Sequence, residues 1–356
     1  MRVLVINCGS ATLKHKLFDQ RGGGLELVAG ATEEIQGADG YRAAVARVMA
    51  ALPVAPEVIA HRVVHGGGRL PEVVRIDPEV LRILREVTPL APLHNGPALE
   101  GIAATLDAGV PLVAALDTAF HASLPERAWR YAIPDLAGVR RYGFHGWSHR
   151  WVTERYAAIT GSPAPTIITL HLGGGCSAAA ILDGRSVDTS MGYSPLEGLV
   201  MATRAGDLDP AILTHLLHGG MSLARLERML NQEAGLTALA GTGDVRQLLA
   251  RDDPAAALAI EIFCYRIRKY VGAYLAVLEG AEALVFTGGI GEHAAAVRQR
   301  VCEGFGWAGL TLEPARNRGH GPRISTDDST LAAYVIPTDE ERLIARETLR
   351  LMRSEA

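Results

Sequence analysis

The hydrophobic pattern of residues 166–183 predicts a hairpin of two strands. Residues 166–172 are mostly β-branched or apolar and predict a buried strand, and residues 178–182 predict a second strand that returns to a turn at 183–184. Three glycines at 173–175 join the two strands. Because glycine leaves its backbone N–H uncovered, an anion such as a phosphate can approach this turn closely. A glycine hairpin without any ligand explains the pattern as well, so the turn alone does not indicate a function.

A second copy of this pattern occurs near the N-terminus. Residues 3–6 are apolar, a small polar turn follows at 7–10, and residues 13–18 predict the returning strand. A third apolar strand is predicted after each hairpin, at 25–31 and at 185–190. Duplicated hairpins, each followed by helical sequence, indicate two related α/β domains. We expect phosphate-binding loops from both domains to face a cleft between them.

Composition limits the classes of function. A chain of 356 residues, 48% of them hydrophobic, is long for one core and predicts two domains. The net charge of −4 offers no basic excess for a nucleic-acid partner. No apolar stretch approaches the roughly 18–20 residues of a membrane helix, and the N-terminal apolar run is too short for a signal peptide. The 4 scattered cysteines lack metal-binding spacing and are typical of reduced thiols, so we expect a soluble, cytoplasmic protein.

Periodicity and turn residues predict the remaining elements. Helices are expected at 40–52, 78–87, 98–108, 148–159, 210–218, 222–233, 244–251, 254–279 and from residue 339 to the C-terminus. Strands are expected at 57–64, 110–116, 283–287 and 334–336. The proline-rich segment 89–97 is expected to form a fixed loop. Ser148 is expected to cap one helix, and Thr338 or Asp339 to cap the last one. The apolar surface of 254–279 suits packing against a second subunit.

Three charged or titratable side chains stand where ligands gather in α/β folds. Arg62 lies at a strand end beside glycines, where its planar guanidinium group can bind two oxygens of an oxyanion; a solvated arginine is the alternative. Asp117 follows the strand 110–116, and ligands collect at the carboxyl ends of strands; a helix N-cap is the competing role. His145 lies between two glycines just before a helix, which favours a function although most single histidines are structural.

Two segments of the second half favour anions or nucleotides. A polar loop that contains Arg204 is closed by a helix starting at Pro210. Strand 283–287 runs into a Gly-Gly-x-Gly motif at 288–291 and then a helix, a common way to seat the base or sugar of a nucleotide against bare backbone. Segment 241–246 is typical of a capped helix start.

Taken in order, these segments resemble the acetokinase family, within the superfamily of acetate and sugar kinases, heat-shock chaperones and actin. The matching segments are 7–10 with 13–14, 61–67, 117–121, 141–146 with 148–149, 171–173, 187–192, 195–201, 203–204, 286–292 and 335–338 with 340–341. They span nearly the whole chain and are highly specific as a set. The resemblance implies two duplicated ribonuclease-H-like domains of the actin-like ATPase type with a central nucleotide cleft. The N-terminal domain would be 1–148, with the helix 339–356 packed back on it, and the C-terminal domain 149–338 would bind the nucleotide and form a homodimer.

The resemblance also implies the site residues. Arg62 and Arg204 would hold the carboxylate and the transferring phosphoryl group. His145 would stabilise the transition state, and Asp117 would be the essential acid. Mg²⁺, with Mn²⁺ as a substitute, would be held by Asn7 and by Glu340 in preference to Glu341. The substrate pocket would be formed by Arg62, Val64, Leu93, His94, Phe144 and Pro195. ATP or ADP would contact Lys14, His171, Leu172, Gly173, Gly174, Gly175, Asp244, Val245, Arg246, Gly289, Ile290, Gly291, Glu292 and His293.

The implied reaction is the reversible, direct in-line transfer of a phosphoryl group from ATP to acetate, which gives acetyl phosphate. A carboxylate with an ordinary pKa of roughly 4–5 is already ionised at neutral pH, so no general base is needed. The difficulty is to bring this anion to a polyanionic phosphate, so cationic side chains and Mg²⁺ should dominate catalysis. Asp117 is then expected to organise the metal ion or an arginine.

Departures from the family pattern concern the nucleotide site. Gly174, His293 and Asp339 each stand where the family usually has Asn. None removes an expected catalytic residue, but they leave the preference for the phosphoryl donor open. A kinase for propionate or another short-chain acid is one alternative, because one methylene is worth only about 1–3 kcal/mol in a pocket. A non-catalytic nucleotide-operated clamp is the other, and it has no reason to assemble the expected pair of arginines and the histidine.

Overall fold

The structure, a computed structural model, describes residues 1–9, 12–35 and 39–355; the side chains of Asp39, Pro92 and Leu93 also lie outside this description. Its contacts divide the chain into two compact units. Unit 1 comprises Met1–Ala122 and Asp339–Ala356, and unit 2 comprises Ser123–Thr338.

Residues 123–148 are grouped with unit 2, whereas the sequence analysis assigns them to the first domain. Hydrogen bonds explain the grouping. Ser123 Oγ donates to the Ser186 carbonyl at 2.8 Å, and the Tyr142 N–H donates to the Gly192 carbonyl at 3.0 Å. The segment is therefore anchored to the third strand of the second sheet and to the loop that follows it.

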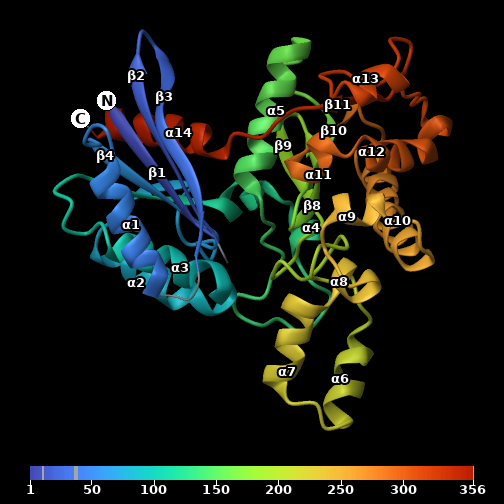
Figure 1. The fold of residues 1–356 in the computed structure, drawn as a ribbon, viewed down its shortest axis with the longest axis horizontal. Helices are drawn as coiled ribbons and strands as arrows, with labels where there is room; N and C mark the ends of the chain where they lie inside the picture. The colour runs from blue at the N-terminus through green and yellow to red at the C-terminus, as the bar shows by residue number, and fades with distance from the viewer. Residues whose placement is uncertain (10–11, 36–38, 356) are drawn as a thin grey trace. The chain divides into compact units, whose positions relative to one another are not determined.

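Unit 1 is built on a six-stranded sheet with the order β3-β2-β1-β4-β6-β5 (Figure 1). The strands are β1 (Arg2–Cys8), β2 (Thr12–Arg21), β3 (Gly24–Glu34), β4 (Val58–Val63), β5 (Val73–Arg75) and β6 (Leu112–Leu116). The first three pair antiparallel, β1, β4 and β6 run parallel, and β5 is antiparallel to β6. The helices are α1 (Asp39–Ala51), α2 (Pro78–Val87), α3 (Pro92–Ala103) and α14 (Glu340–Ser354). The parallel part brings the carboxyl ends of β1, β4 and β6 to one edge, where Asn7, Arg62 and Asp117 lie.

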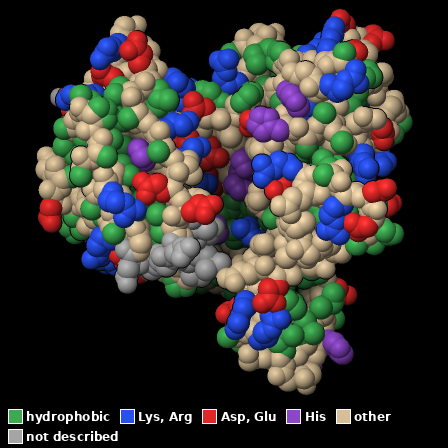
Figure 2. All heavy atoms as spheres, in the orientation of Figure 1, with side chains coloured by type: hydrophobic (Ala, Val, Ile, Leu, Met, Phe, Trp, Pro, Cys, Tyr) green, Lys and Arg blue, Asp and Glu red, His purple; other side chains and the backbone are tan. Residues whose placement is uncertain are grey.

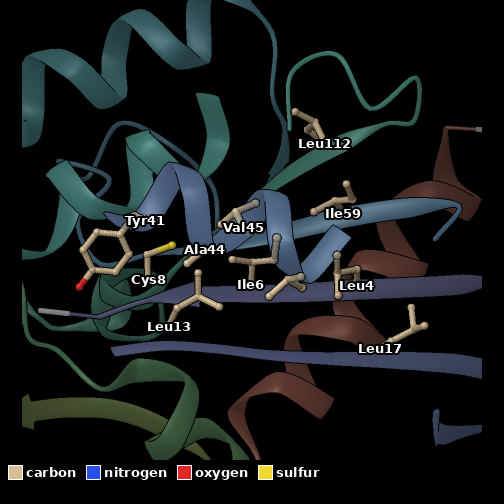
Figure 3. Close-up of a cluster of buried hydrophobic side chains, with 11 residues drawn as sticks. Leu4, Ile6, Cys8, Leu13, Leu17, Tyr41, Ala44, Val45, Ile59 and Leu112 are labelled. Atoms are coloured by element: carbon tan, nitrogen blue, oxygen red, sulfur yellow. The ribbon is translucent and has the colours of Figure 1, made fainter. Parts of the chain in front are cut away.

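The two faces of this sheet carry different side chains. One face forms a hydrophobic cluster whose members include Leu4, Ile6, Cys8, Leu13, Leu17, Tyr41, Ala44, Val45, Ile59 and Leu112 (Figure 3). Successive side chains of a strand point to opposite faces. Asn7 and its register partner Arg62, like Lys14 and Lys16 of β2, therefore point to the other face, on which α14 packs.

The expected loop at 89–97 is wrong. A short 3-10 helix covers Thr88–Leu90, and α3 begins at Pro92 and continues through Pro97. Asn95 of this helix is fully buried, and its side-chain amide both donates to the His65 carbonyl (2.9 Å) and accepts from the His65 N–H (3.0 Å). Packing of α3 on β1 and β4 therefore overrides the local proline signal.

Unit 2 repeats the strand order of unit 1. Its sheet has the order β11-β10-β7-β8-β9. The strands are β7 (Ile167–Leu172), β8 (Cys176–Leu182), β9 (Arg185–Thr189), β10 (Ala283–Thr287) and β11 (Ala332–Val335). β7, β8 and β9 pair antiparallel, and β7, β10 and β11 run parallel. The series β9-β8-β7-β10-β11 matches β3-β2-β1-β4-β6 strand for strand, which confirms the duplicated α/β fold that the repeat predicts.

Helices cover both faces of the second sheet. α5 (Gly146–Thr160) packs on β7 and β10, and α10 (Pro254–Val277) packs on β7 and β8. The other helices are α4 (Glu126–Trp129), α6 (Pro210–His218), α7 (Leu223–Arg228), α8 (Gly235–Ala240), α9 (Val245–Ala250), α11 (Gly288–His293), α12 (Ala295–Cys302) and α13 (Pro314–Arg318). The helix expected at 222–233 is α7 continued by a π-helical turn, and α8 was not expected. In Figure 1, α6 and α7 form a helical hairpin that extends from unit 2.

Basic and acidic side chains are interspersed on the face shown in Figure 2, in both units. In the described ranges, no helix is both long and apolar enough to span a membrane. The four cysteines, Cys8, Cys176, Cys264 and Cys302, are buried free thiols. Burial raises the pKa of the Cys8 and Cys176 thiols to about 12, so they stay protonated and unreactive at neutral pH.

Candidate active site

In unit 1, Arg62 lies between two carboxylates. Its Nη2 is 3.0 Å from Asp117 Oδ2, its Nε is 3.2 Å from Glu340 Oε2, and its Nη1 donates to Asn7 Oδ1 at 3.5 Å. The Arg62 side chain is only 10% exposed. Burial opposes the charged form, but Asp117 and Glu340 outweigh it and raise the pKa of Arg62. Arg62 is therefore a buried, paired cation and not a solvated one.

The acidic residues that open α14 have different partners. Glu341 is buried, with Lys14 Nζ at 3.0 Å and Lys16 Nζ at 3.2 Å. Asp339 holds the N-cap position but makes no capping hydrogen bond, so its expected role as a cap is wrong; it binds Lys16 Nζ at 2.6 Å instead. Glu341 and Asp339 thus form ion pairs with lysines. Of these three acidic residues, Glu340 is the one paired with Arg62. Lys14, expected at the nucleotide, is paired with Glu341.

The oxygen atoms around Arg62 fit the Mg²⁺ ion that the family resemblance implies. Asn7, Asp117 and Glu340 bring an amide oxygen and two carboxylates to one guanidinium group. Mg²⁺ is commonly held by one or two carboxylates together with water and substrate phosphates. Over the described ranges, no three His, Cys, Asp or Glu side chains form a metal cluster by themselves. A cation held by Asn7, Asp117 and Glu340 would need further ligands besides these three side chains.

Arg62 only partly compensates the negative charge of Glu340. Burial, with Asp117 and Glu341 nearby, raises its pKa from 4.5 to about 7 although Arg62 acts in the opposite direction. Because the folded pKa lies above the ordinary value, the unfolded chain releases this proton first as the pH rises. The free energy of unfolding therefore falls as the pH rises from about 4.5 to about 7 and Glu340 loses its proton.

We expect Glu340→Gln to be more stable than the wild type at pH 8, because the neutral amide avoids the cost of ionising this carboxyl. The difference should shrink toward zero as the pH is lowered to about 4.5. Urea denaturation in metal-free buffer over this pH range measures it. Glu26→Gln, at an exposed carboxylate of β3, is the control and should leave the pH dependence unchanged. A Glu340→Gln protein less stable than the wild type at pH 8 would contradict the expectation.

In unit 2, His145 lies at the N-cap of α5 in a left-handed conformation (φ 56°, ψ 31°). Its Nδ1 is 2.9 Å from Ser177 Oγ, and its ring stacks on His171 with 4.2 Å between ring centroids. His171 Nδ1 is in turn 2.7 Å from Ser148 Oγ. The expected cap at Ser148 is wrong, because α5 already begins at Gly146 and Ser148 holds His171 instead. A strained backbone and a fixed ring plane are typical of a functional position.

Arg204 borders the same glycine turn as His145. A Cβ atom added to Gly175 would lie 3.2 Å from His145 Nε2 and 4.0 Å from Arg204 Nη1. Arg204 Nη1 donates to the Pro195 carbonyl at 3.2 Å, and in the part of the chain that the structure describes Arg204 has no ion pair. Burial lowers the pKa of Arg204, but a guanidinium group is basic enough to stay charged at neutral pH. A partly buried cation without an acidic partner among the described residues is suited to bind an anion.

The backbone at Arg204 is fixed by contacts that no motif reveals. Arg141 Nη1 donates to the Thr189 carbonyl at 3.0 Å and so holds the start of the preceding loop. The Met201 N–H donates to the Arg204 carbonyl at 2.9 Å. Gly235 has φ +63°, and a Cβ atom there would lie 2.2 Å from the Met201 carbonyl oxygen. Only glycine permits this close approach.

A pocket of about 500 Å³ in unit 2 collects many of the expected nucleotide contacts. Its lining is Gly173, Gly174, Gly243, Asp244, Val245, Arg246, Leu249, Gly289, Ile290, His293 and Ala294. Asp244 caps α9 by accepting from the Arg246 N–H at 2.9 Å, and Arg246, by its hydrogen bonds, lowers the pKa of Asp244 to about 2. Three segments far apart in sequence, after β7, before α9 and after β10, thus meet around one cavity large enough for a nucleoside.

Other expected nucleotide residues do not line this pocket. Leu172 is buried in β7, and Glu292 accepts from the N–H groups of Gly288 (3.0 Å) and Thr338 (3.1 Å). The Gly291 carbonyl accepts from the fully buried Arg298 at 2.8 Å. Gly291 and Glu292 therefore shape the loop that carries Gly289, Ile290 and His293, and the sequence analysis did not identify Arg298 as its anchor. The His171 ring stacks on that of His145.

The residues expected around the acyl group belong to both units. Val64, at 5% exposure, and His94 are in unit 1, whereas Phe144, at 2% exposure, and Pro195 are in unit 2. The side chain of Leu93 lies outside the described residues, as does Ser10 of the first turn. The acyl pocket stays a prediction.

Comparison with known proteins identifies the family. A model of the acetokinase family matches residues 52–346. The chain belongs to the acetokinase family. An acetate kinase of Chloroherpeton thalassium is 51% identical over 317 residues, which are 83% of this chain and 76% of that protein. The crystal structure of Porphyromonas gingivalis acetate kinase aligns with TM-score 0.87 at 36% identity and covers 99% of each chain. That of a propionate kinase from Francisella tularensis aligns with TM-score 0.89 at 34% identity and covers 97% of this chain and 98% of the other.

Sequence reasoning missed the polar side chains behind His145 in this acetokinase fold. His149 and Ser177 are fully buried and hydrogen-bonded to each other. A signal for both was available. His149 lies one helical turn beyond His145, and Ser177 stands directly opposite His171 in the antiparallel pairing of β7 and β8. Each therefore shares a face with an expected site residue.

Proposed function

We propose that this protein is a cytoplasmic enzyme that phosphorylates acetate with ATP, reversibly, to give acetyl phosphate. Membership of the acetokinase family and the names of its relatives support this reaction. The observation that carries the proposal is the wall of unit 2 at the glycine turn. Arg204, which has no ion pair among the described residues, and the hydrogen-bonded His145 both border Gly175 there, and the adjoining Gly173 and Gly174 line the nucleotide-sized pocket. A nucleotide clamp without transfer chemistry needs no such pair of donors.

The proposed mechanism needs cations and no general base. Acetate is ionised at neutral pH and attacks the phosphorus without losing a proton. Arg204 and His145 would donate hydrogen bonds to the oxygens of the transferring phosphoryl group, where charge develops in the transition state. Arg62 would bind the carboxylate, and its pairing with Asp117 supports an orienting role for that acid. Asn7 and Glu340 would hold Mg²⁺, which when bound neutralises charge on the nucleotide phosphates.

The test is a coupled assay of ADP release with Mg²⁺ and formate, acetate, propionate or butyrate in turn. We expect acetate to give the highest kcat/KM. A higher value for propionate would favour the alternative, a kinase for propionate. The similarity to a propionate kinase at 34% identity supports testing this alternative. ADP release that is independent of any carboxylate would instead indicate a nucleotide clamp. No turnover of any carboxylate would contradict the kinase proposal.

We expect Gly174→Asn to lower the KM for ATP by about tenfold to a hundredfold while kcat stays within about twofold, because one hydrogen bond to a charged phosphate is worth about 1.5–3 kcal/mol. Gly174 lines the nucleotide pocket, and a Cβ atom there would meet no heavy atom within 4 Å. Gly174→Ala adds the carbon without the amide and is the matched control. Equal KM values for the two variants would show that the added amide makes no contact with the nucleotide.

We also propose a homodimer formed through α10. Leu258 and Tyr265, two helical turns apart on one face, are 52% and 57% exposed. Gly272 lies a further two helical turns along the same face and lines a hollow. Trp307, which is 76% exposed, lines the same hollow. Exposed apolar side chains along one face of a helix suit packing against a second copy of the chain. Sedimentation equilibrium should give twice the chain mass of 37.9 kDa, and Tyr265→Glu should shift it toward the monomer. A monomeric wild type would contradict the proposal.

A further inference from the structure

A chain of buried hydrogen bonds leads from strand β7 through helix α5 to His145. Thr169 Oγ1 is 2.7 Å from His149 Nδ1, and His149 Nε2 is 2.7 Å from Ser177 Oγ. Ser177 Oγ is in turn 2.9 Å from His145 Nδ1. Thr169, His149 and Ser177 are each 0% exposed. Bulk solvent therefore does not reach these groups, and their polar hydrogens are expected to be hydrogen-bonded.

Counting protons gives the chain a direction. The Ser177 hydroxyl has a single proton, so it donates to one of its two histidine nitrogens and accepts from the other. In the ranges that the structure describes, the Thr169 side chain has His149 Nδ1 as its one hydrogen-bond partner. A buried hydroxyl proton is rarely left without an acceptor, so Thr169 donates to His149 Nδ1. The His149 proton is then on Nε2 and is donated to Ser177, and Ser177 donates to His145 Nδ1.

We propose that Thr169, His149 and Ser177 form a relay that fixes the tautomer of neutral His145, with the ring proton on Nε2. Nε2 is the nitrogen beside Gly175, on the side of Arg204. The relay thereby presents an N–H donor to an oxygen of the transferring phosphoryl group, and this part of the inference rests on the proposed function. In the opposite tautomer, a lone pair would face that oxygen and repel it. No proton moves along the chain; its three members are positioning residues that act through His145.

His171 complements the relay by holding the plane of the His145 ring. The two rings stack with an interplanar angle of 25°, and Ser148 fixes His171 through its Nδ1. Stacking sets where the ring lies, and it has no influence on which nitrogen is protonated. The hydroxyl of Ser177 therefore makes the specific contribution, and its removal should change the tautomer without moving the ring far.

The tautomer can be measured directly in the full-length protein labelled with ¹⁵N-histidine. Two-dimensional ¹⁵N–¹H spectra distinguish a protonated from a bare ring nitrogen, and the signals of His145 are those lost in His145→Asn. We expect a bare Nδ1 and a protonated Nε2 in the wild type. In Ser177→Ala and in Thr169→Val, the form protonated on Nδ1 should gain population. Ser190→Ala is the control: Ser190 is equally buried, but its Oγ accepts from the Ala178 N–H, so the His145 signals should not change.

Kinetics provide the second measurement. In Ser177→Ala, kcat should fall about tenfold to a hundredfold, as is usual when the partner that orients a functional histidine is removed. The KM values for acetate and ATP should stay within about twofold, because the donor acts in the transition state. Ser177→Thr retains the hydroxyl and should restore both the tautomer and most of kcat.

The relay would be overturned by a wild-type His145 protonated on Nδ1, or by unchanged His145 signals in both Ser177→Ala and Thr169→Val. An altered tautomer with an unchanged kcat would overturn its link to phosphoryl transfer. A wild-type protein with the expected tautomer but without carboxylate kinase activity would contradict the proposed function instead, and would leave the tautomer assignment standing. The two failures are therefore distinguishable.

Discussion

Arg204→Gln should lower kcat for acetyl phosphate formation by about 10³- to 10⁵-fold, the range found when a transition-state arginine is absent from other phosphoryl transferases. The reason is that Arg204 is a partly buried cation at the glycine turn with no ion pair among the described residues. Its charge is therefore available to the transferring phosphoryl group. Steady-state kinetics with saturating ATP and acetate measure the effect.

Arg204→Gln should not destabilise the fold, and this separates catalysis from folding. Burial without an acidic partner already lowers the pKa of Arg204, so a neutral side chain removes a desolvation cost. We expect the Tm of the variant to be equal to or above that of the wild type. Arg185→Gln, at an exposed arginine of β9, is the control and should change neither kcat nor Tm. A kcat within tenfold of the wild type would remove Arg204 from the mechanism.

Arg62→Met, unlike Arg204→Gln, should lower both the stability and the activity of the protein. Removing Arg62 leaves Asp117 and Glu340 as neighbouring buried carboxylates without their cation. Breaking a buried pair by removing one partner typically costs about 3–5 kcal/mol. The loss should be greater at pH 8 than at pH 5, because protonation of the raised-pKa Glu340 relieves the repulsion at the lower pH. Urea denaturation at both pH values, in metal-free buffer, measures it.

The double variant Arg62→Met with Glu340→Gln provides the control for Arg62. It removes one carboxylate together with the cation and should recover much of the lost stability at pH 8. It should not recover activity, because the acetate carboxylate still lacks its cation. An Arg62→Met protein as stable as the wild type at pH 8 would show that the carboxylates around this position need no compensation.

Local patterns were sufficient for the elements that depend on neighbouring residues. Period-2 strands and glycine turns predicted both hairpins, and the parallel strands put Arg62 and Asp117 at one sheet edge, where the structure pairs them at 3.0 Å. The motif after β10 predicted residues that line the nucleotide-sized pocket. These predictions succeed because strand direction and the end of a strand can be determined within a few residues of sequence.

Local patterns failed where distant residues compete. Pro97 looked like a helix breaker, but α3 is kept by its packing and by the bonds of buried Asn95 to His65. Asp339 looked like a helix cap, but Lys16 of β2 takes its carboxylate. In each case a contact between residues far apart in sequence is stronger than the local preference.

The sequence by itself determined the repeat, the family and most of the residue types that the chemistry requires. The tertiary structure alone decided that Glu340 faces Arg62 while the lysines of β2 take Glu341, and that His149 and Ser177 stand behind His145. The physical reason is burial: a polar group without water must find a partner, and that partner is selected by the packing of distant strands and helices.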